Sequence, residues 1–148
     1  MFRVHQFDKV EMYVYTTPEQ SWQEHERLVA IEEEILQGLE LPYRAVNIPA
    51  GDLGAQAAKK IDLEAWLPSQ GRYREVTSCS NTTDFQARRL KVRYRGEHGT
   101  APVHTLNGTA AVGRMLLALL ENGQQDDGSV VVPKTLVPLG APQKLSRQ

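Results

Sequence analysis

The segment from Glu75 to Arg89 carries the side chains best suited to chemistry in this chain. Glu75 supplies a carboxylate, Ser78 supplies a hydroxyl three residues later, and the segment ends in the pair Arg88–Arg89. One carboxylate and one hydroxyl suit a magnesium ion that takes its remaining ligands from water and from substrate phosphates. The segment therefore indicates a site for a metal ion and a nucleotide.

Glu75 also has a structural interpretation. Strict alternation along a strand places Glu75 and Ser78 on opposite faces, so a β-bulge near Thr77 is needed to bring them together. A strand carboxylate is also commonly held in a cross-strand ion pair, for which Arg72 and Arg74 are the available partners. The metal site thus depends on a local irregularity of the strand.

Arg114 is the only charged residue in the apolar run from Ala110 to Leu120. Since the burial of an unpaired guanidinium is costly, an anionic partner is required. That partner is either a carboxylate such as Glu64, in a structural salt bridge, or a substrate phosphate, to which a guanidinium offers planar bidentate donors. Both alternatives stay open.

Residues 2–16 predict a strand with functional side chains along one face. Val10, Met12 and Val14 alternate with Glu11 and Tyr13, and this period of two residues is typical of a strand with one face in the core. On the second face Phe7 can stack on a purine, and Glu11, roughly 13 Å further along, can hold an ammonium group. An aromatic ring packed under a helix and a solvated glutamate are the structural alternative.

A long amphipathic helix is predicted to follow this strand. Thr17-Pro18-Glu19-Gln20 is a capping-box signal, and Pro42 lies just beyond the expected end of the helix. The residues expected to face the core recur at spacings of three and four, namely Leu28, Ile31, Ile35 and Leu39.

The rest of the chain predicts short strands, close turns and two more helices. The strands are expected at 43–48, 61–67, 72–78, 91–95, 101–106 and 129–132, and the helices at 84–90 and 110–120. The second of these helices is apolar on every side, which is typical of a buried helix. The fold class is therefore α+β, an antiparallel β-sheet flanked by helices.

Composition and charge set further limits. The chain has 148 residues, of which 41% are hydrophobic and 24% charged, as is typical of one globular domain rather than a disordered protein. The net charge of −1 gives no bulk attraction to nucleic acid, so contact with RNA requires a local patch.

Cys79 is the single cysteine, which excludes an internal disulfide and indicates a reducing compartment. Residues 1–6 lead into no apolar signal or membrane segment, so we expect no membrane partner and a cytoplasmic location.

Together these motifs resemble the catalytic core of seryl-tRNA synthetases, which belong to the class II aminoacyl-tRNA synthetases. Residues 3–11 resemble the second half of class II motif 2, residues 72–89 a seryl-specific segment, and residues 106–122 motif 3. The resemblance implies a partial class II catalytic domain over residues 1–140, and we expect a flexible tail at 141–148.

The resemblance also implies a role for each candidate residue. It implies that Arg3 contacts ATP, that Phe7 stacks on adenine and that Arg114 clamps the far phosphates. Glu75 and Ser78 would bind Mg²⁺ and the phosphates, so that Glu75 and Arg114 are the catalytic pair. The serine pocket would be formed by Glu11, Asn107 and Thr109. The implied reaction joins serine and ATP into seryl-adenylate and then transfers the seryl group to tRNA(Ser).

Several elements of the family have no match in this chain. They are motif 1, the N-terminal helical arm that holds tRNA, and the first part of motif 2 with its phosphate-binding arginine. We therefore expect a C-terminal part of the core that is inactive alone, and a homodimer only for the full-length enzyme. Two other functions stay open: a noncatalytic synthetase-like domain with a binding or regulatory role, and a ligase that loads an amino acid onto a carrier protein.

Overall fold

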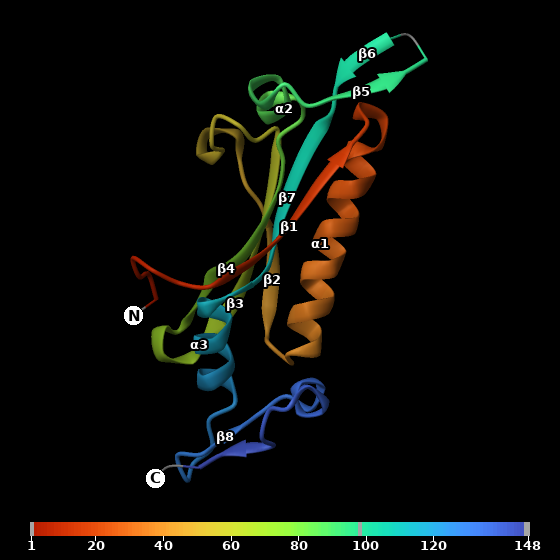
Figure 1. Ribbon diagram of the computed structural model, residues 1–148. Coiled ribbons are helices and arrows are strands. Elements are labelled where there is room, and N and C mark those ends of the chain that lie inside the picture. The colour runs from red at the N-terminus through yellow and green to blue at the C-terminus, as the bar shows by residue number, and fades with distance from the viewer. Residues whose placement is uncertain (1, 98, 147–148) are drawn as a thin grey trace.

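Five strands form one antiparallel sheet in the computed structural model, which describes residues 2–97 and 99–146 (Figure 1). Their order across the sheet is β1 (Lys9–Thr16), β7 (His104–Val112), β4 (Arg72–Asn81), β3 (Lys59–Leu67) and β2 (Tyr43–Asn47). Every neighbouring pair is antiparallel. The predicted α+β class, with an antiparallel sheet flanked by helices, is confirmed.

The helices α1 (Ser21–Gly38) and α3 (Gly113–Asn122) cover the same face of this sheet. The main core joins Leu36 of α1 and Met115 of α3 to alternate residues of β3, since a strand turns every second side chain to one face. These alternate residues are Leu63, Ala65 and Leu67. The opposite face of the sheet is left open along much of its length, and it carries the candidate site.

The long helix differs from its sequence prediction in two details. Its entry is a 3₁₀ turn, η1 (Pro18–Gln20), and the Thr17 side chain makes no capping hydrogen bond. The buried stripe also contains polar residues, so of the four predicted core positions only Leu28 is fully buried. The buried residues of α1 are Ser21, His25, Leu28, Val29, Glu32 and Leu36. The stripe is shifted because these polar side chains find partners on the sheet.

The first strand is shorter than predicted, because it begins at Lys9 rather than at residue 2. Lys9 pairs with Val112, the last residue of β7, and the chain then turns into α3. Residues 2–8 therefore have no neighbouring strand to pair with on that side, and they form an irregular segment.

The boundary between β7 and α3 also corrects the sequence prediction. The sequence predicts that residues 110–112 begin the helix, yet they extend β7, and α3 begins at Gly113. Pairing with β1 extends the strand, because Ala111 and Val112 lie opposite Val10 and Lys9. The helix is not buried on every side either, since the Leu116 side chain is 58% exposed.

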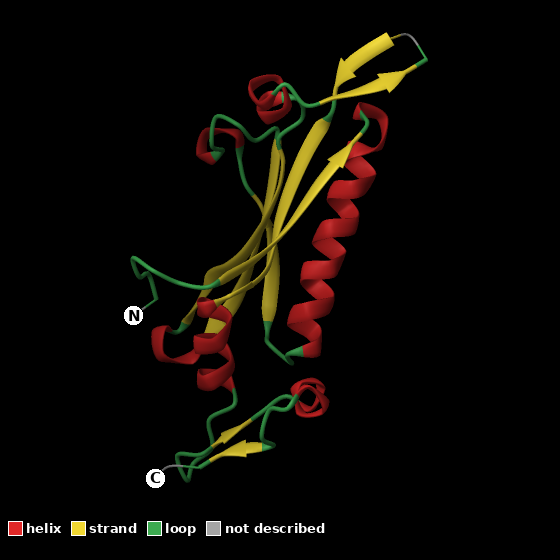
Figure 2. Ribbon diagram, viewed as in Figure 1, coloured by secondary structure: helices red, strands yellow, loops and turns green. Residues whose placement is uncertain are grey.

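Two small hairpins lie away from the main sheet, near opposite ends of the molecule (Figure 2). At one end, α2 (Phe85–Leu90) precedes β5 (Arg93–Gly96), which pairs with β6 (Gly99–Pro102); His98 of the predicted turn lies outside the described residues. At the other end, β8 (Val130–Val131) pairs with β9 (Lys144–Leu145), with η4 (Lys134–Leu139) between them. Residues 144–145 are thus paired within the segment predicted to be a flexible tail, while residues 147–148 lie outside the described part.

Among the described residues, no helix combines the length and the apolar character that a membrane-spanning helix requires.

Candidate active site

Glu75 and Ser78 lie on the same face of β4 because that strand contains a β-bulge. Glu64 of β3 pairs with Glu75, whereas Asp62, two residues earlier, pairs with Ser78, so β4 contains one extra residue in this stretch. Asp62 and Glu64 share a face of β3, so their partners share a face of β4. The bulge on which the predicted metal site depends is confirmed.

Arg114 projects from the first turn of α3 toward this bulge. Its Nη1 atom lies 3.8 Å from Oε2 of Glu75 and donates a hydrogen bond of 3.3 Å to the Glu75 backbone oxygen. The partner is not Glu64, whose Oε2 lies 2.6 Å from Nε of Arg44. Two residues that the sequence singles out separately therefore meet, in a long ion pair that leaves the guanidinium able to bind a further anion.

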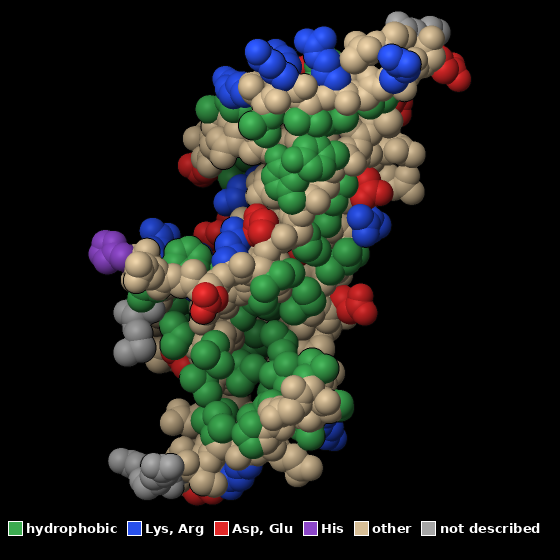
Figure 3. Space-filling model, viewed as in Figure 1, with side chains coloured by type: hydrophobic (Ala, Val, Ile, Leu, Met, Phe, Trp, Pro, Cys, Tyr) green, Lys and Arg blue, Asp and Glu red, His purple; other side chains and the backbone are tan. Residues whose placement is uncertain are grey.

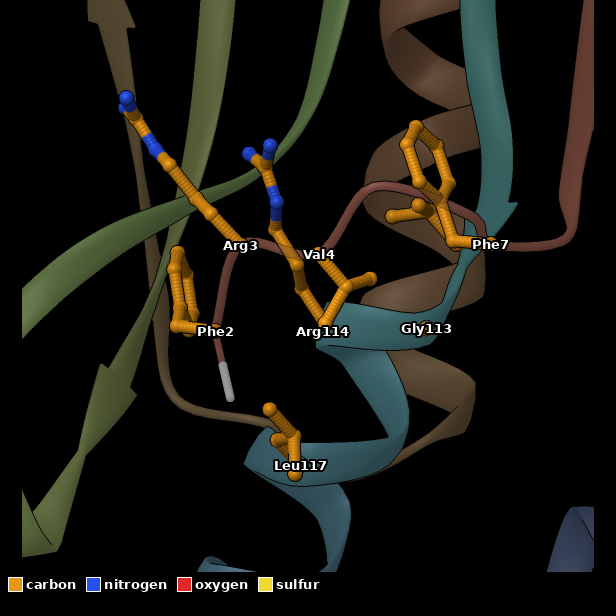
Figure 4. Close-up of a pocket in the computed structure, with 8 residues that line it drawn as sticks. Phe2, Arg3, Val4, Phe7, Gly113, Arg114 and Leu117 are labelled. Atoms are coloured by element: carbon orange, nitrogen blue, oxygen red, sulfur yellow. The ribbon is translucent and has the colours of Figure 1, made fainter.

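A pocket of about 380 Å³ opens beside Arg114, within the range of small-ligand sites. The irregular segment 2–8 forms one wall of it, and the start of α3 forms the other. Figure 4 shows the side chains of Arg3 and Arg114 extending in the same direction, with the Phe7 ring to one side. The lining residues are Phe2, Arg3, Val4, Phe7, Val112, Gly113, Arg114 and Leu117. Two guanidinium groups between aromatic rings suit a nucleotide with its phosphates.

Phe7 and Phe2 differ in how well the sequence indicates them. The Phe7 ring is 55% exposed at the pocket, so it is not an aromatic packed under a helix. The sequence gives no signal for Phe2, because it stands outside any periodic pattern. Its ring lies 4.5 Å from the guanidinium carbon of Arg74 and 5.3 Å from that of Arg114. Arg74 is thus drawn to an aromatic ring, and not to Glu75 as in the structural alternative.

Glu11, Asn107 and Thr109 form a hydrogen-bonded group on the same open face. Asn107 Nδ2 donates to Glu11 Oε1 at 3.0 Å, and Thr109 Oγ1 donates to Glu11 Oε2 at 3.1 Å. The Nζ atom of Lys9, a residue to which the sequence assigns no role, lies 2.7 Å from the same Oε2. Glu11 is therefore not simply solvated, since three side chains hold its carboxylate in place.

A second hollow of about 90 Å³ connects the two groups. It is lined by Phe7, Lys9, Glu75, Val76, Thr77, Ser78, Thr109, Val112 and Arg114. Phe7 and Arg114 belong to both hollows, and Thr109 leads on to Glu11. All eight candidate residues consequently lie in one continuous area. They come from the N-terminal segment, β1, β4, β7 and α3.

A buried glutamate that the sequence does not indicate lies directly behind this area. Glu32 of α1 is 1% exposed, and Thr77 Oγ1 donates a 3.0 Å hydrogen bond to its Oε2. Burial raises the pKa of Glu32 to about 8, against the opposing effect of the hydrogen bond from Thr77. Gly108 leaves room for this carboxyl, because a Cβ atom there would lie 2.7 Å from Glu32 Oε1.

Asp62 is a second acidic group that only the structure reveals near the site. It lies opposite Ser78 in the sheet, and Lys60 Nζ lies 2.9 Å from its Oδ1. Burial raises the pKa of Asp62, while Lys60 lowers it.

Among the described residues, no group of three or more histidine, cysteine, aspartate or glutamate side chains is arranged to hold a metal ion.

Comparison with known proteins gives a consistent result. The model of the tRNA synthetase class II core domain (G, H, P, S and T) matches residues 1–123. A serine–tRNA ligase from Rubrobacter xylanophilus is 61% identical over 140 residues, which are 93% of this chain and 33% of that protein. One from Pyrococcus furiosus is 60% identical over 139 residues, which are 92% of this chain and 30% of that protein. The chain thus spans about a third of the length of these curated relatives.

Two solved structures are similar to the chain over 99% of its length. A seryl-tRNA synthetase from Pyrococcus horikoshii, complexed with ATP, has a TM-score of 0.96 at 51% identity, and the match covers 34% of that chain. A cytoplasmic serine-tRNA ligase from Naegleria fowleri, in complex with AMP, has a TM-score of 0.91 at 43% identity, and the match covers 36% of that chain.

Proposed function

Since the chain belongs to the family of tRNA synthetase class II core domains, we propose that its open face binds serine and ATP for the formation of seryl-adenylate. The seryl group would then pass to tRNA(Ser). The observation that carries this proposal is the hydrogen-bonded group of Glu11, Asn107 and Thr109 beside the Arg114 pocket.

The group around Glu11 has the chemistry that serine requires. A carboxylate that is already oriented by an amide and a hydroxyl attracts the α-ammonium group of an amino acid. The small hydroxyl side chain of serine can then exchange hydrogen bonds with Thr109 and Asn107, which donate to Glu11 in the structure. A pocket that hydrogen-bonds a substrate hydroxyl also rejects amino acids that lack it.

The pocket between residues 2–8 and α3 would hold the nucleotide. Phe7 offers an exposed ring for the adenine base, and Arg3 and Arg114 offer guanidinium groups for the phosphates. The similar protein from Pyrococcus horikoshii was solved in complex with ATP, which supports the assignment.

Glu75 and Ser78 are the residues that we assign to Mg²⁺. The β-bulge gives them a common face, and one carboxylate with one hydroxyl is a sufficient protein contribution when phosphates and water supply the other ligands. When bound, the ion would neutralise part of the charge on the phosphates of ATP.

Adenylate formation on this face would depend on positioning and charge neutralisation. A carboxylate oxygen of serine attacks the α-phosphorus of ATP, and the bond from that phosphorus to pyrophosphate breaks. Glu11 would hold the ammonium end of serine so that its carboxylate points toward the nucleotide. Arg114 would stabilise the negative charge that gathers on the departing pyrophosphate.

The properties of the whole protein are also part of the proposal. They comprise the transfer of serine to tRNA(Ser), assembly into a homodimer, and a location in the cytoplasm that fits the single buried cysteine, Cys79.

A direct test is the binding of a non-hydrolysable seryl-adenylate analogue, 5′-O-(N-seryl)sulfamoyladenosine, measured by titration calorimetry. Glu11→Gln should weaken binding by at least about tenfold, since it removes the negative charge opposite the ammonium group. Glu34→Gln, an exposed change on α1, is the matched control and should bind as the parent does. Equal affinity in the parent and Glu11→Gln would contradict the serine pocket. Binding of ATP without any preference for the seryl analogue would instead favour the noncatalytic domain.

A further inference from the structure

The two central strands of the sheet separate at the proposed site. β4 pairs with β7 over residues 79–81, and the last pair on the side of the site is Cys79 with Gly108. Beyond that pair, among the described residues, β4 continues to pair only with β3, and β7 only with β1. We call the divergence of residues 75–78 from residues 109–112 the fork. The hollow of about 90 Å³ lies in the fork, since residues of both strands line it.

The fork divides the proposed site into two halves. Glu75 and Ser78, which we assign to Mg²⁺, lie on β4 at one side of it. Thr109, which donates a hydrogen bond to Glu11 in the serine pocket, lies on β7 at the other side. A seryl-adenylate reaches across the fork, so the spacing of the two strands determines whether both of its ends can be held at once. Because the described residues of the two strands form no pairs there, another group has to set this spacing.

The carboxyl group of Glu32 joins the two strands at the base of the fork, from the helix-covered face. On β4, Thr77 Oγ1 donates a 3.0 Å hydrogen bond to Glu32 Oε2. On β7, a Cβ atom at Gly108 would lie 2.7 Å from Glu32 Oε1, so the carboxyl occupies the space of the missing side chain. Burial, which raises the pKa of Glu32, is partly opposed by the backbone N–H of Thr109, which therefore also lies close to the carboxyl. Glu32 thus contacts both strands where their own pairing stops.

Glu32 is a neutral acid in this position. Figure 3 shows acidic and basic side chains beside one another on the surface in the middle of the molecule, where β1 and β4 lie in Figure 1. Glu32, in contrast, is 1% exposed, so water does not solvate a charge there. Burial raises its pKa to about 8, and the carboxyl groups of Glu11 on β1 and Asp62 on β3 act in the same direction. The carboxyl is therefore mostly protonated at pH 7, and an amide of the same shape can replace it.

We propose that Glu32 is a positioning residue that sets the spacing of the fork, and with it the alignment of the serine pocket and the Mg²⁺ site. Glu32 does not reach either substrate, because it lies on the helix-covered face of the sheet. It acts through Thr77 on β4 and through Gly108 and Thr109 on β7. The inference rests on the proposed function, since only a ligand that spans the fork depends on the spacing of its two strands.

Titration calorimetry of the whole chain with two ligands tests this role. In the proposed site the seryl-adenylate analogue spans the fork, with its seryl end at Thr109 and its sulfamoyl group beside Ser78, whereas ATP does not enter the serine pocket. Glu32→Ala should weaken binding of the analogue at least about tenfold, because its two ends are no longer aligned, and leave the ATP affinity unchanged. Equal losses for ATP and the analogue, or no loss for the analogue, would overturn the proposal.

Glu32→Gln tests whether the shape and hydrogen bond of the neutral carboxyl are sufficient. Its amide keeps the length of the side chain and an oxygen that accepts from Thr77. Glu32→Gln should therefore bind both ligands as the parent does. A loss of analogue binding as large as that of Glu32→Ala would contradict the role of a neutral carboxyl.

Leu28→Ala is the matched control for lost packing of α1. Leu28 lies one helical turn before Glu32 and packs with Cys79 and Leu106, at and below the base of the fork. Its replacement should lower the stability measured by urea denaturation and leave both affinities of the folded chain unchanged. A loss of analogue binding equal to that of Glu32→Ala would show that helix packing, and not the carboxyl, sets the spacing.

Thr77→Val provides a milder second variant. It keeps the shape of the side chain and removes the hydroxyl that donates to Glu32, so β4 should stay folded, which circular dichroism checks. It should weaken binding of the analogue less than Glu32→Ala does, and leave ATP binding unchanged. Full affinity for the analogue in Thr77→Val would show that this hydrogen bond does not hold the fork.

Hydrogen exchange of the ligand-free chain separates this inference from the proposed function. In Glu32→Ala we expect faster amide exchange at Thr77 and Thr109, which flank the fork, and unchanged exchange at Asn81 and Leu106, which are paired below it. If this local change occurs and the parent does not bind the analogue, the proposed function is wrong and the role of Glu32 in the fork stands. If the parent binds the analogue and Glu32→Ala changes neither exchange nor affinity, the role of Glu32 is wrong and the proposed function stands.

Discussion

Glu75 and Ser78, three residues apart in one strand, present their side chains on the same face of the sheet, where Arg114 lies 3.8 Å from the Glu75 carboxylate. A regular strand would separate them. The bulge costs the sheet one regular pairing, and it brings together a carboxylate, a hydroxyl and a guanidinium at the edge of a pocket. That local departure from regular structure is what makes the proposed Mg²⁺ and phosphate site possible.

Glu75→Gln should abolish the Mg²⁺ site while the bulge and the neighbouring strands stay in place. Without the carboxylate charge, the ion loses the anionic ligand that the bulge places on the same face as Ser78, so we expect Mg²⁺ to give no increase in ATP affinity. Val76→Ala is the control, because it keeps the bulge and only reduces core packing, by about 2 kcal/mol. Titration calorimetry measures the ATP affinity of each variant with and without Mg²⁺. A Glu75→Gln variant whose ATP affinity rises with Mg²⁺ as much as that of the parent would show that Glu75 does not hold the ion.

Arg114→Ala should lower the affinity for ATP at least about tenfold and change stability little, since the side chain is partly exposed and its ion pair is long. Met115→Ala changes the neighbouring residue, which is buried in the core. It should therefore lower the free energy of unfolding by about 2–5 kcal/mol and leave the ATP affinity of the folded protein unchanged. Calorimetry and urea denaturation measure the two quantities. The phosphate role of Arg114 fails if both variants bind ATP equally well.

The buried Glu32 predicts a specific dependence of stability on pH. Its pKa is raised to about 8 in the folded chain and is about 4.3 in an unfolded one, so the folded state binds the proton more tightly. Its contribution to stability is complete below pH 4.3 and is lost as the pH rises toward 8. Glu32→Gln, which mimics the neutral form, should remove this loss. Urea denaturation between pH 5 and 9 measures it, with the exposed Glu26→Gln as the control. Parallel pH profiles for the parent and Glu32→Gln would mean that Glu32 is not the group that titrates.

Gly108→Ala should destabilise the sheet by about 1–3 kcal/mol. The added methyl group would lie 2.7 Å from Glu32 Oε1 and 3.2 Å from the Met12 methyl carbon. Because the first contact is with the Glu32 side chain, the same change in a Glu32→Ala background should cost less. A double-mutant cycle by urea denaturation gives the coupling energy. A coupling of zero would show that the two groups do not compete for the same space.

The sequence predicts the middle of the sheet well and the ends of its elements poorly. The β3–β4 hairpin has clear alternation and a turn at Gly71, where φ is +60°, so it is found where predicted. The start of β1 and the end of β7 depend on where a partner strand stops, and a single segment does not contain that information. Residues 110–112 are apolar and fit a strand or a helix equally well until β1 pairs with them.

Some residues of the candidate site can likewise be predicted from the sequence, and others cannot. Glu75, Ser78 and Arg114 can be selected from side-chain chemistry, and the resemblance to known motifs adds the serine pocket. Phe2 is not indicated, because its ring contacts the guanidinium groups of Arg74 and Arg114 in distant segments. Lys9 lies two residues before Glu11 on the same strand, and alternation alone does not show that the two side chains form an ion pair. Glu32 is not predicted either, because an acidic residue in a helix is normally expected to be exposed. Its burial depends on the hydrogen bond from Thr77 and on the space beside Gly108, and both residues lie in other segments of the chain.

Chemical-shift mapping tests the central claim most directly. The ¹⁵N-labelled chain is titrated with 5′-O-(N-seryl)sulfamoyladenosine in the presence of Mg²⁺, and the backbone amide signals are followed. We predict saturable shifts on the open face, at Phe7, Glu11, Ser78, Thr109 and Arg114, and none at exposed positions of α1 such as Glu26. Shifts confined to other surfaces, or none at millimolar analogue, would contradict a seryl-adenylate site on this face.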